Sequence, residues 1–406
     1  MRKAIIILLC GGILLACILD QYVFCPQYTY CDSHAFTGDN LYNPYKAFNE
    51  KYWKKCNFHA HTGSWHGITN GNGSPSDLWS RYASMGFAFN AVSNYQHIDT
   101  TYCHYHNYIS AYEHGFNVTK THQLVLGDQG IVWMDYIFPQ TLSNKQHILN
   151  LLAADTTNII ILNHPSLRHG YTTNDVKYLE NYDAMEVLNP AAESFRYWDI
   201  ALSSGKPVSI IGSDDMHNIS DSLSSGKFCT LTYLPDINRQ QLLSSIRKNK
   251  TIAMWIPIIP GMSFSERADM IKQSSPDIKS IEVLRDSLFI EFDTAVANFL
   301  LKGNNGETLL SYGHIQKLAF HVPANEAYVR ASYMTADGIQ FFLNPIYRSN
   351  GSLPGRSARA AEHIILHHRF NYLVAAIMLL IFFISTSFIY LRKYYNSENS
   401  SNYLIY

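Results

Sequence analysis

Short apolar runs that end in histidine or aspartate recur along this chain of 406 residues. The run from Ile159 to Leu162 leads to His164, which stands before a proline, and the run from Pro207 to Ile211 leads to Asp215. Such runs favour strands that are buried on both faces, as in parallel sheets. Proline disfavours a helical residue ahead of it, so His164 is expected at the carboxyl end of a strand. An α/β fold with its chemistry at the strand ends is predicted.

Two pairs of candidate ligands share a spacing of two residues. His59 and His61 form one pair, and Asp215 and His217 form the other. Side chains two apart on a strand point the same way, so both members of a pair can reach one metal ion. Either pair alone could be no more than a polar strand end. Together they predict a metal site built from two strand ends.

The order and spacing of these residues resemble the PHP superfamily, named for polymerase and histidinol phosphatase, over roughly residues 54 to 230. An opening H-x-H-T strand, a His-Pro and a closing Asp-x-His are motifs of that family. The resemblance implies a distorted (β/α)7 barrel and metal-dependent phosphoesterase activity. It also implies metal ligation by the matching positions and by one further histidine with a family-like offset: His59, His61, His66, His164, Asp215 and His217.

The chain departs from the family pattern after the second predicted strand. Where the family usually has aspartate and histidine, this chain has Asn94 and Tyr95. His97 could supply the lost imidazole, because residues two apart share a strand face, or it could be a surface histidine. Asp128 or Gln129 stands where the family has a glutamate. Five further residues are possible metal ligands or residues that contact and orient the ligands: His97, Glu113, His114, Asp128 and Glu186.

The predicted cofactors are one to three divalent metal ions. Imidazoles combined with a carboxylate suit Zn, Mn or Fe. Neighbouring ions would bind phosphate oxygens and lower the pKa of a shared water, so no catalytic group beyond metal-activated water is predicted. Few carboxylates leave such a site positively charged, which favours an anionic substrate. Arg168 could contact the phosphate, although an exposed arginine without a role is the commoner case.

Both ends of the chain carry apolar segments. Arg2 and Lys3 precede an apolar stretch, and Leu14 to Cys17 resembles a lipobox, so residues 1–25 are predicted to be a signal peptide, lipobox or membrane anchor. Residues 370–391 contain no charge and are long enough for a transmembrane helix, with 392–406 as a cytoplasmic tail. These segments predict a membrane-anchored protein whose catalytic part is extracytoplasmic, either periplasmic or at a bacterial cell surface.

Four further segments are predicted between these ends. Residues 50–250 are the predicted barrel, and residues 251–278 are a linker or covering segment that prolines interrupt. Short alternating runs separated by turn signals predict a small antiparallel β-sandwich over residues 279–348. Residues 349–369, rich in serine, glycine and arginine near their start, are the predicted tether to the membrane helix.

The leading functional prediction is a phosphoesterase that acts at the membrane on a phosphorylated small molecule or an envelope component. A net charge of −1 gives no reason to expect nucleic-acid binding. A degenerate PHP-like binding or sensory module with little or no catalysis is one alternative, because acidic ligands are lost at Asn94 and Tyr95. A metal-dependent amidohydrolase-type enzyme is another, although the lysine or second histidine pair that such enzymes usually need does not stand out.

Overall fold

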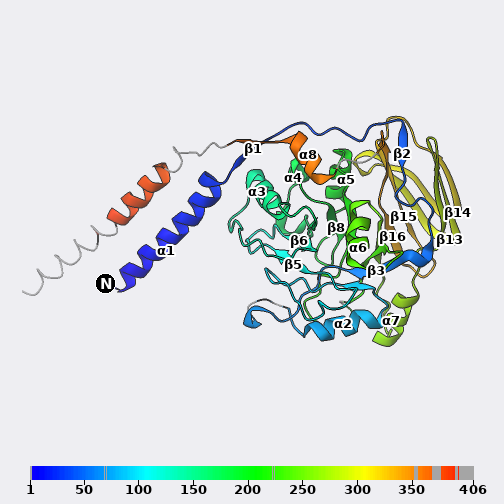
Figure 1. The fold of residues 1–406 in the computed structure, drawn as a ribbon, viewed down its shortest axis with the longest axis horizontal. Helices are drawn as coiled ribbons and strands as arrows, with labels where there is room; N and C mark the ends of the chain where they lie inside the picture. The colour runs from blue at the N-terminus through cyan, green and yellow to red at the C-terminus, as the bar shows by residue number, and fades with distance from the viewer. Residues whose placement is uncertain are drawn as a thin grey trace, which may run out of the picture.

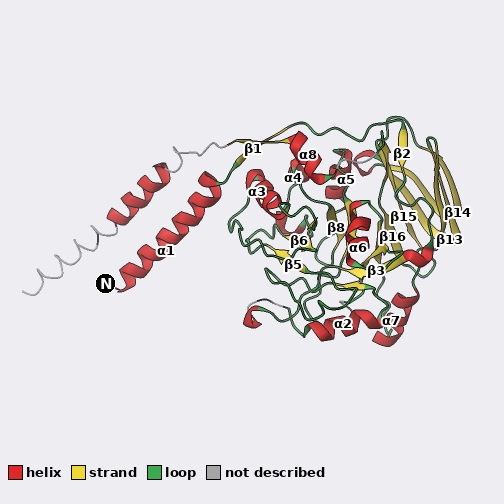
Figure 2. Cartoon of the chain, viewed as in Figure 1, coloured by secondary structure: helices red, strands yellow, loops and turns green. Residues whose placement is uncertain are grey.

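The computed structural model describes residues 2–67, 69, 71–221, 223, 225–351, 355–367, 376–388 and 392. Two large sheets and the helices around them make up the body of the molecule (Figure 1, Figure 2). Helix α1 (Arg2–Leu19) extends away from this body, next to a second helical segment at 376–388 (Figure 1). A two-stranded sheet of β1 (Gln27–Tyr30) and β18 (Ile364–His367) joins the bases of these two segments.

The smaller sheet has five strands in the order β5–β6–β7–β8–β9. They are β5 (Ala111–His114), β6 (Gln123–Leu126), β7 (Ile159–Leu162), β8 (Ala184–Leu188) and β9 (Ser209–Gly212). β6 pairs antiparallel with both β5 and β7, whereas β7, β8 and β9 are parallel. All residues of the five strands are buried, which agrees with their mainly apolar sequences outside β5, whose Glu113 and His114 are also buried.

The larger sheet has eleven strands, with the main order β12–β13–β15–β16–β11–β10–β3–β4. Strand β14 pairs with β13, and β17 pairs with both β15 and β2. The strands are β2 (Asn40–Tyr42), β3 (Trp53–Asn57), β4 (Phe89–Asn90), β10 (Phe228–Tyr233), β11 (Thr251–Trp255), β12 (Ile278–Leu284), β13 (Ser287–Lys302), β14 (Thr308–His321), β15 (Tyr328–Met334), β16 (Gln340–Leu343) and β17 (Ile346–Ser349).

Seven further α-helices are described around the sheets. They are α2 (Pro75–Ser84), α3 (Leu142–Leu152), α4 (Thr173–Tyr178), α5 (Phe195–Ser203), α6 (Arg239–Arg247), α7 (Phe264–Gln273) and α8 (Arg356–His363). Helices α2, α3, α4 and α7 each begin with a capping box, in which a serine or threonine and the residue three positions later satisfy backbone N–H groups reciprocally. Short helical turns lie at Asp20–Phe24, Glu50–Tyr52, Trp65–Gly67, Leu167–His169 and Asn304–Gly306.

The predicted (β/α)7 barrel is wrong, because the described strands form open sheets instead of one closed barrel. Parallel neighbours need a crossover of about a dozen residues or more, and the chain between β5 and β6 is shorter than that. These two strands therefore form an antiparallel pair. Residues 91–110, between β4 and β5, form turns and irregular chain where a barrel would need a helix. The alternation of strand and helix is thus broken on both sides of β5.

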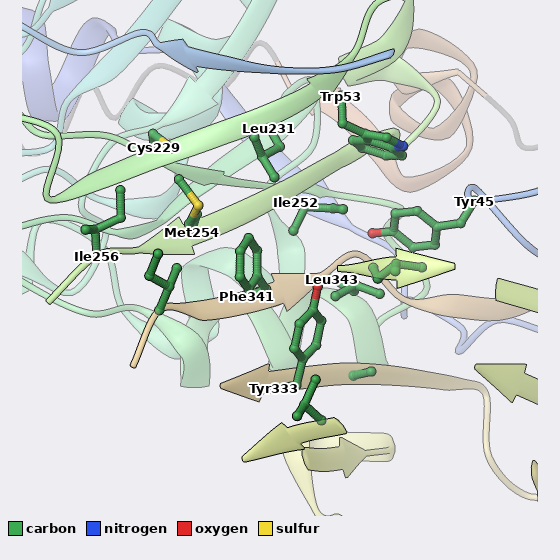
Figure 3. Packing of buried hydrophobic residues seen from close by; sticks show 14 of the residues in the cluster. Tyr45, Trp53, Cys229, Leu231, Ile252, Met254, Ile256, Tyr333, Phe341 and Leu343 are labelled. Carbon is green, nitrogen blue, oxygen red and sulfur yellow. The ribbon is translucent and has the colours of Figure 1, made fainter. Parts of the chain in front are cut away.

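The predicted separate β-sandwich is also wrong. The region does contain antiparallel strands, but β16 pairs with β11, so they continue the sheet that includes β10 and β3. Figure 3 shows Leu231, Ile252 and Met254 packed in one cluster with Tyr333 and Phe341. A single hydrophobic core therefore crosses the predicted boundary. How the chain divides into independently folding units stays a prediction.

The predicted membrane anchoring, with an extracytoplasmic catalytic part, is corrected as well. Within the residues that the structure describes, no helix combines the length and the apolar character needed to cross a membrane. Of the predicted transmembrane segment 370–391, the structure describes 376–388 as a helix, and the remainder lies outside the described residues.

Candidate metal centre

The candidate centre is assembled where β3, β7, β8 and β9 end. His59 and His61 follow β3, and Asp215 follows β9. Between the two histidines, Ala60 forms a parallel bridge with Met216, and the N–H of His61 donates to the carbonyl of Met216 at 2.7 Å. This backbone pairing aligns the two motifs of the sequence, so that the pair at 59 and 61 lies against Asp215.

The imidazole of His59 lies at the middle of the cluster and is fully buried. Its Nε2 atom lies 3.1 Å from Nε2 of His61, 3.3 Å from Oε1 of Glu113 and 3.2 Å from Oδ1 of Asp215. His61 Nε2 lies 3.2 Å from Oε2 of Glu113 and 3.4 Å from Oδ1 of Asp215. The ligand atoms of four residues thus converge on one small volume.

Two overlapping groups of described residues have the geometry to hold a metal ion. One consists of His59, Glu113 and His164, and the other of His59, His61 and Asp215. Within each group the ligand atoms all lie within 4.8 Å of one another. Because His59 belongs to both groups, the two possible ion positions are neighbours.

Glu113 connects His164 to the cluster, and His122 fixes the position of the Glu113 carboxylate. Glu113 projects from β5, and its Oε1 atom lies 3.4 Å from Nε2 of His164. His122 directly precedes β6 and donates from Nδ1 to the same oxygen at 2.8 Å, while the amide of Asn163 donates to it at 3.0 Å. His122 has no motif around it and was missed by the sequence reasoning. Its place two residues before the apolar run Leu124–Leu126 is the signal that could have identified it.

Glu186 and Asn189 form hydrogen bonds that orient the candidate ligands. Glu186 Oε1 lies 3.0 Å from Nδ1 of His59, so Nε2 is the nitrogen that remains for a metal ion. Glu186 Oε2 accepts from the backbone N–H of His164 and from the amide of Asn189, each at 3.0 Å. The same amide lies 3.3 Å from Oδ2 of Asp215. These bonds hold three candidate ligands relative to one another.

The buried carboxylates of the cluster need a nearby positive charge to compensate their own. Every ion-pair contact recorded for Glu113, Glu186 and Asp215 among the described residues involves a histidine. Burial lowers the pKa of His59, but Asp215, Glu113 and Glu186 outweigh burial and raise it well above its usual range. Burial raises the pKa of Glu113, yet His122 and His59 bring it well below its usual range. Charged carboxylates in such surroundings attract either protons on the imidazoles or a metal cation.

Unsatisfied buried atoms show that a cation fits here. Oε2 of Glu113 and Oδ1 of Asp215 accept no hydrogen bond within the described part of the chain, although both atoms are buried. Such atoms are rare in folded proteins and point to a missing ion or water. The donor set of imidazole nitrogens and carboxylate oxygens is one that Zn, Mn and Fe accept.

Backbone strain is concentrated at the same place. His164 has φ 29° and Asp215 has φ 46°, both in the left-handed region that residues other than glycine seldom adopt. Such conformations cost roughly 1–3 kcal/mol each and cluster at functional sites. Here they turn the chain sharply at the ends of β7 and β9 and place both side chains in the cluster.

Tyr95 and Asn94 occupy the positions where the sequence departs from the family pattern. The ring of Tyr95 stacks on His61 with centroids 4.8 Å apart. Burial raises the pKa of the Tyr95 phenol, and Glu113 and Asp215 raise it further, so the phenol keeps its proton. Asn94 accepts from the N–H of Thr62 at 2.8 Å and donates to the Thr62 hydroxyl at 2.9 Å. Both residues therefore position the strand end that carries His61.

Of the six metal ligands predicted from the sequence, His59, His61, His164 and Asp215 lie in the two groups. His217 stacks on His61 with centroids 4.3 Å apart, and its Nδ1 donates to the carbonyl of Asp215. His66 is exposed in the turn Trp65–Gly67 and belongs to neither group. Ligand roles for all six stay predictions.

The remaining candidates divide between the cluster and its surroundings. Glu113 and Glu186 belong to the cluster, as described above. His97 is exposed beside Trp65. His114 is buried with its nitrogens bound to Gln123 and to the carbonyl of Met134. Two further candidates lie in loops, where Asp128 accepts backbone N–H groups of its own turn and Arg168 occupies a left-handed turn.

Comparisons with known proteins identify one distant structural likeness and no relative by sequence. No family model matches the sequence, and no curated protein matches it. Among solved structures, the chain is similar to a two-domain protein from Bacteroides vulgatus that contains a predicted PHP-like metal-dependent phosphoesterase. The likeness has a TM-score of 0.37 and 13% identity, and covers 78% of this chain and 98% of that chain. A likeness this distant does not establish a shared activity.

Proposed function

We propose that this protein is a metal-dependent hydrolase of the PHP type that cleaves phosphate esters. The observation that carries the proposal is the pair of overlapping ligand groups, His59 with Glu113 and His164, and His59 with His61 and Asp215. The five side chains come from four places in the sequence and meet in one largely buried volume. Outside this cluster, among the described residues, each carboxylate in an ion pair contacts at least one lysine or arginine, whereas the ion pairs of Glu113 and Asp215 involve histidines alone.

Divalent ions held by these residues would polarise a phosphoryl oxygen and lower the pKa of a bound water. Other residues of the chain orient the ligands that would hold these ions. Glu186 fixes the orientation of His59, and His122 together with Asn163 fixes that of Glu113. A ligand side chain that is also hydrogen-bonded to a neighbouring residue keeps its orientation while substrate binds and leaves.

Substrate would approach from the side of Asp215 and His217. Their side chains are 13% and 26% exposed, whereas those of His59, His61, Glu113 and His164 are at most 3% exposed. Metal ions bound there would add positive charge beside the carboxylates of Glu113 and Asp215. This charge suits the anionic phosphate that the sequence resemblance implies.

The test is metal content and hydrolysis measured on the full-length protein. We expect Mn- or Zn-supplemented protein to retain metal by elemental mass spectrometry and to hydrolyse p-nitrophenyl phosphate or its bis ester. His59→Ala, which belongs to both groups, should lose both properties. His321→Ala, an exposed histidine on β14, is the matched control and should lose neither. A metal-free protein, or a His59→Ala variant with full activity, would contradict the proposal.

A further inference from the structure

A series of aromatic rings leads from the candidate metal centre toward the surface. Tyr95 stacks on His61, and the ring of Phe116 lies 6.1 Å from that of Tyr95. The indole N–H of Trp65 donates to the carbonyl of Tyr95 at 2.7 Å, and the ring of Trp133 lies 5.9 Å from that of Trp65. We call Trp65, Tyr95, Phe116 and Trp133 the aromatic wall.

Three members of the aromatic wall are open to solvent. Trp65 is 39% exposed, Phe116 is 53% exposed and Trp133 is 60% exposed. Large aromatic side chains normally bury most of their area, and neighbouring exposed ones mark binding sites. The wall begins at Tyr95, which contacts the candidate ligand His61, so it adjoins the candidate metal centre.

The aromatic wall is held in place by the surrounding chain. The loop that carries Trp133 is tied on both sides of it, because Gln96 donates to the carbonyl of Val132 at 3.1 Å and a ring nitrogen of His114 lies 2.8 Å from the carbonyl of Met134. Trp65 has φ 53°, a left-handed conformation that is unusual for a bulky residue. A strained backbone that presents an exposed indole is typical of a binding position.

We propose that the aromatic wall binds a planar aromatic ring in the organic part of the phosphate ester, which makes aryl or nucleoside phosphates the substrate class. This inference rests on the proposed phosphoesterase function. The rings of Trp65 and Trp133 meet at 78°, so a flat ring can stack on one indole and contact the edge of the other. An aliphatic chain would gain no comparable geometric fit.

Charge near the aromatic wall agrees with this substrate class. The ammonium group of Lys120 lies 5.6 Å from the centroid of Tyr95, on the ring that also contacts His61. A cation over the ring that contacts His61 suits a ligand whose phosphate is close to its aromatic ring. The phosphate would then lie at the centre and the ring at Trp65 and Trp133.

The test is calorimetric binding of phosphonates, whose C–P bond resists hydrolysis, to the Mn-loaded full-length protein. Phenylphosphonate is expected to bind about tenfold more tightly than ethylphosphonate and cyclohexylphosphonate, which is the usual scale of one aromatic stacking contact. Trp133→Ala and Trp65→Ala should remove this preference, so that phenylphosphonate binds no more tightly than ethylphosphonate. Phe289→Ala, an exposed ring on β13, is the matched control and should keep the preference.

The two proposals fail in different ways. Equal affinity for the three phosphonates, or a phenyl preference that survives in both tryptophan variants, would overturn the aromatic wall as a substrate site and leave the phosphoesterase proposal standing. A protein that retains no metal and binds none of the phosphonates would overturn both. Because Trp65 also holds Tyr95 through a hydrogen bond, Trp133→Ala is the variant that separates ring binding from local folding.

Discussion

The carboxylate of Glu186 lies 3.0 Å from Nδ1 of His59 and accepts the backbone N–H of His164 through its other oxygen. One side chain on β8 thus sets the orientation of a histidine that follows β3 and of one that follows β7. Carboxylates behind histidine ligands are a common device of metal sites, because they fix the tautomer and the direction of the lone pair. The position of Glu186 therefore decides how well His59 and His164 can bind a metal ion.

Replacing Glu186 by glutamine should weaken metal binding about 10- to 100-fold with the fold retained. Three donors point at the carboxylate, from His59, His164 and Asn189, and a glutamine offers one acceptor oxygen and a competing N–H₂ group. Titration of metal-free protein with Mn, followed by calorimetry, measures the effect. Glu193→Gln, at an exposed position, is the control. Unchanged affinity in Glu186→Gln would show that His59 needs no such support.

Much of the cluster could be predicted from spacing. Residues two apart on extended chain point the same way, and this placed His59 with His61 near the end of β3. Glu113 could be named only as one candidate among several, because nothing local shows that β5 turns this side chain toward His164. Asp128 was given similar weight, but its carboxylate is used by the N–H groups of its own turn. Tertiary pairing, which no local pattern reveals, decided between them.

The strands were easier to predict than their arrangement. Buried runs at Ile159–Leu162 and Ser209–Gly212 are parallel-sheet strands, as their apolar sequences indicate. Closure into a barrel depended on the family resemblance, and the short link between His114 and Gln123 prevents it by making that pair antiparallel. The strands after residue 278 were expected to pair among themselves. Their junction with β11 through β16 depends on a long-range register that a single sequence does not specify.

Breaking the ion pair between Asp199 on α5 and Arg330 on β15 should strongly destabilise the protein. It is bidentate, with N–O distances of 2.6 Å and 2.7 Å, and both side chains are buried. Arg330→Met would leave a buried carboxylate without its partner, which typically costs about 3–5 kcal/mol. We expect that loss in the free energy of unfolding measured by urea denaturation.

The control for Arg330→Met is Lys317→Met, because Lys317 pairs with Glu291 on the exposed face of β14 and β13. Solvent screens that pair, so its loss should change stability little. Equal effects of the two substitutions would contradict the assignment of the Asp199 and Arg330 pair as a tie between helix and sheet.

Lys206 should make stability depend on pH in the alkaline range. Burial lowers its pKa from 10.5 to about 8, against the opposing effect of Glu180. Between these two values the unfolded chain binds more protons than the folded chain, so this group makes the free energy of unfolding rise with pH. The difference in unfolding free energy between wild type and Lys206→Met should therefore shift in favour of wild type from pH 8 to pH 10. Lys248→Met, at an exposed position, should show no such shift. A difference that is constant with pH would contradict the prediction.

Removing metal should destabilise the protein and not merely inactivate it. Glu113 and Asp215 are buried beside imidazoles, and without a cation their charge must be met by protons on those imidazoles. A ligand that binds only the folded state stabilises it by about 3 kcal/mol at a hundred times its dissociation constant. Addition of a chelator to Mn-loaded protein should therefore lower the melting temperature, and excess Mn should restore it. His61→Ala and Asp215→Ala should melt at a temperature that chelator and Mn leave unchanged. A melting temperature of wild type that does not respond to chelator would mean that the cluster binds protons instead of metal.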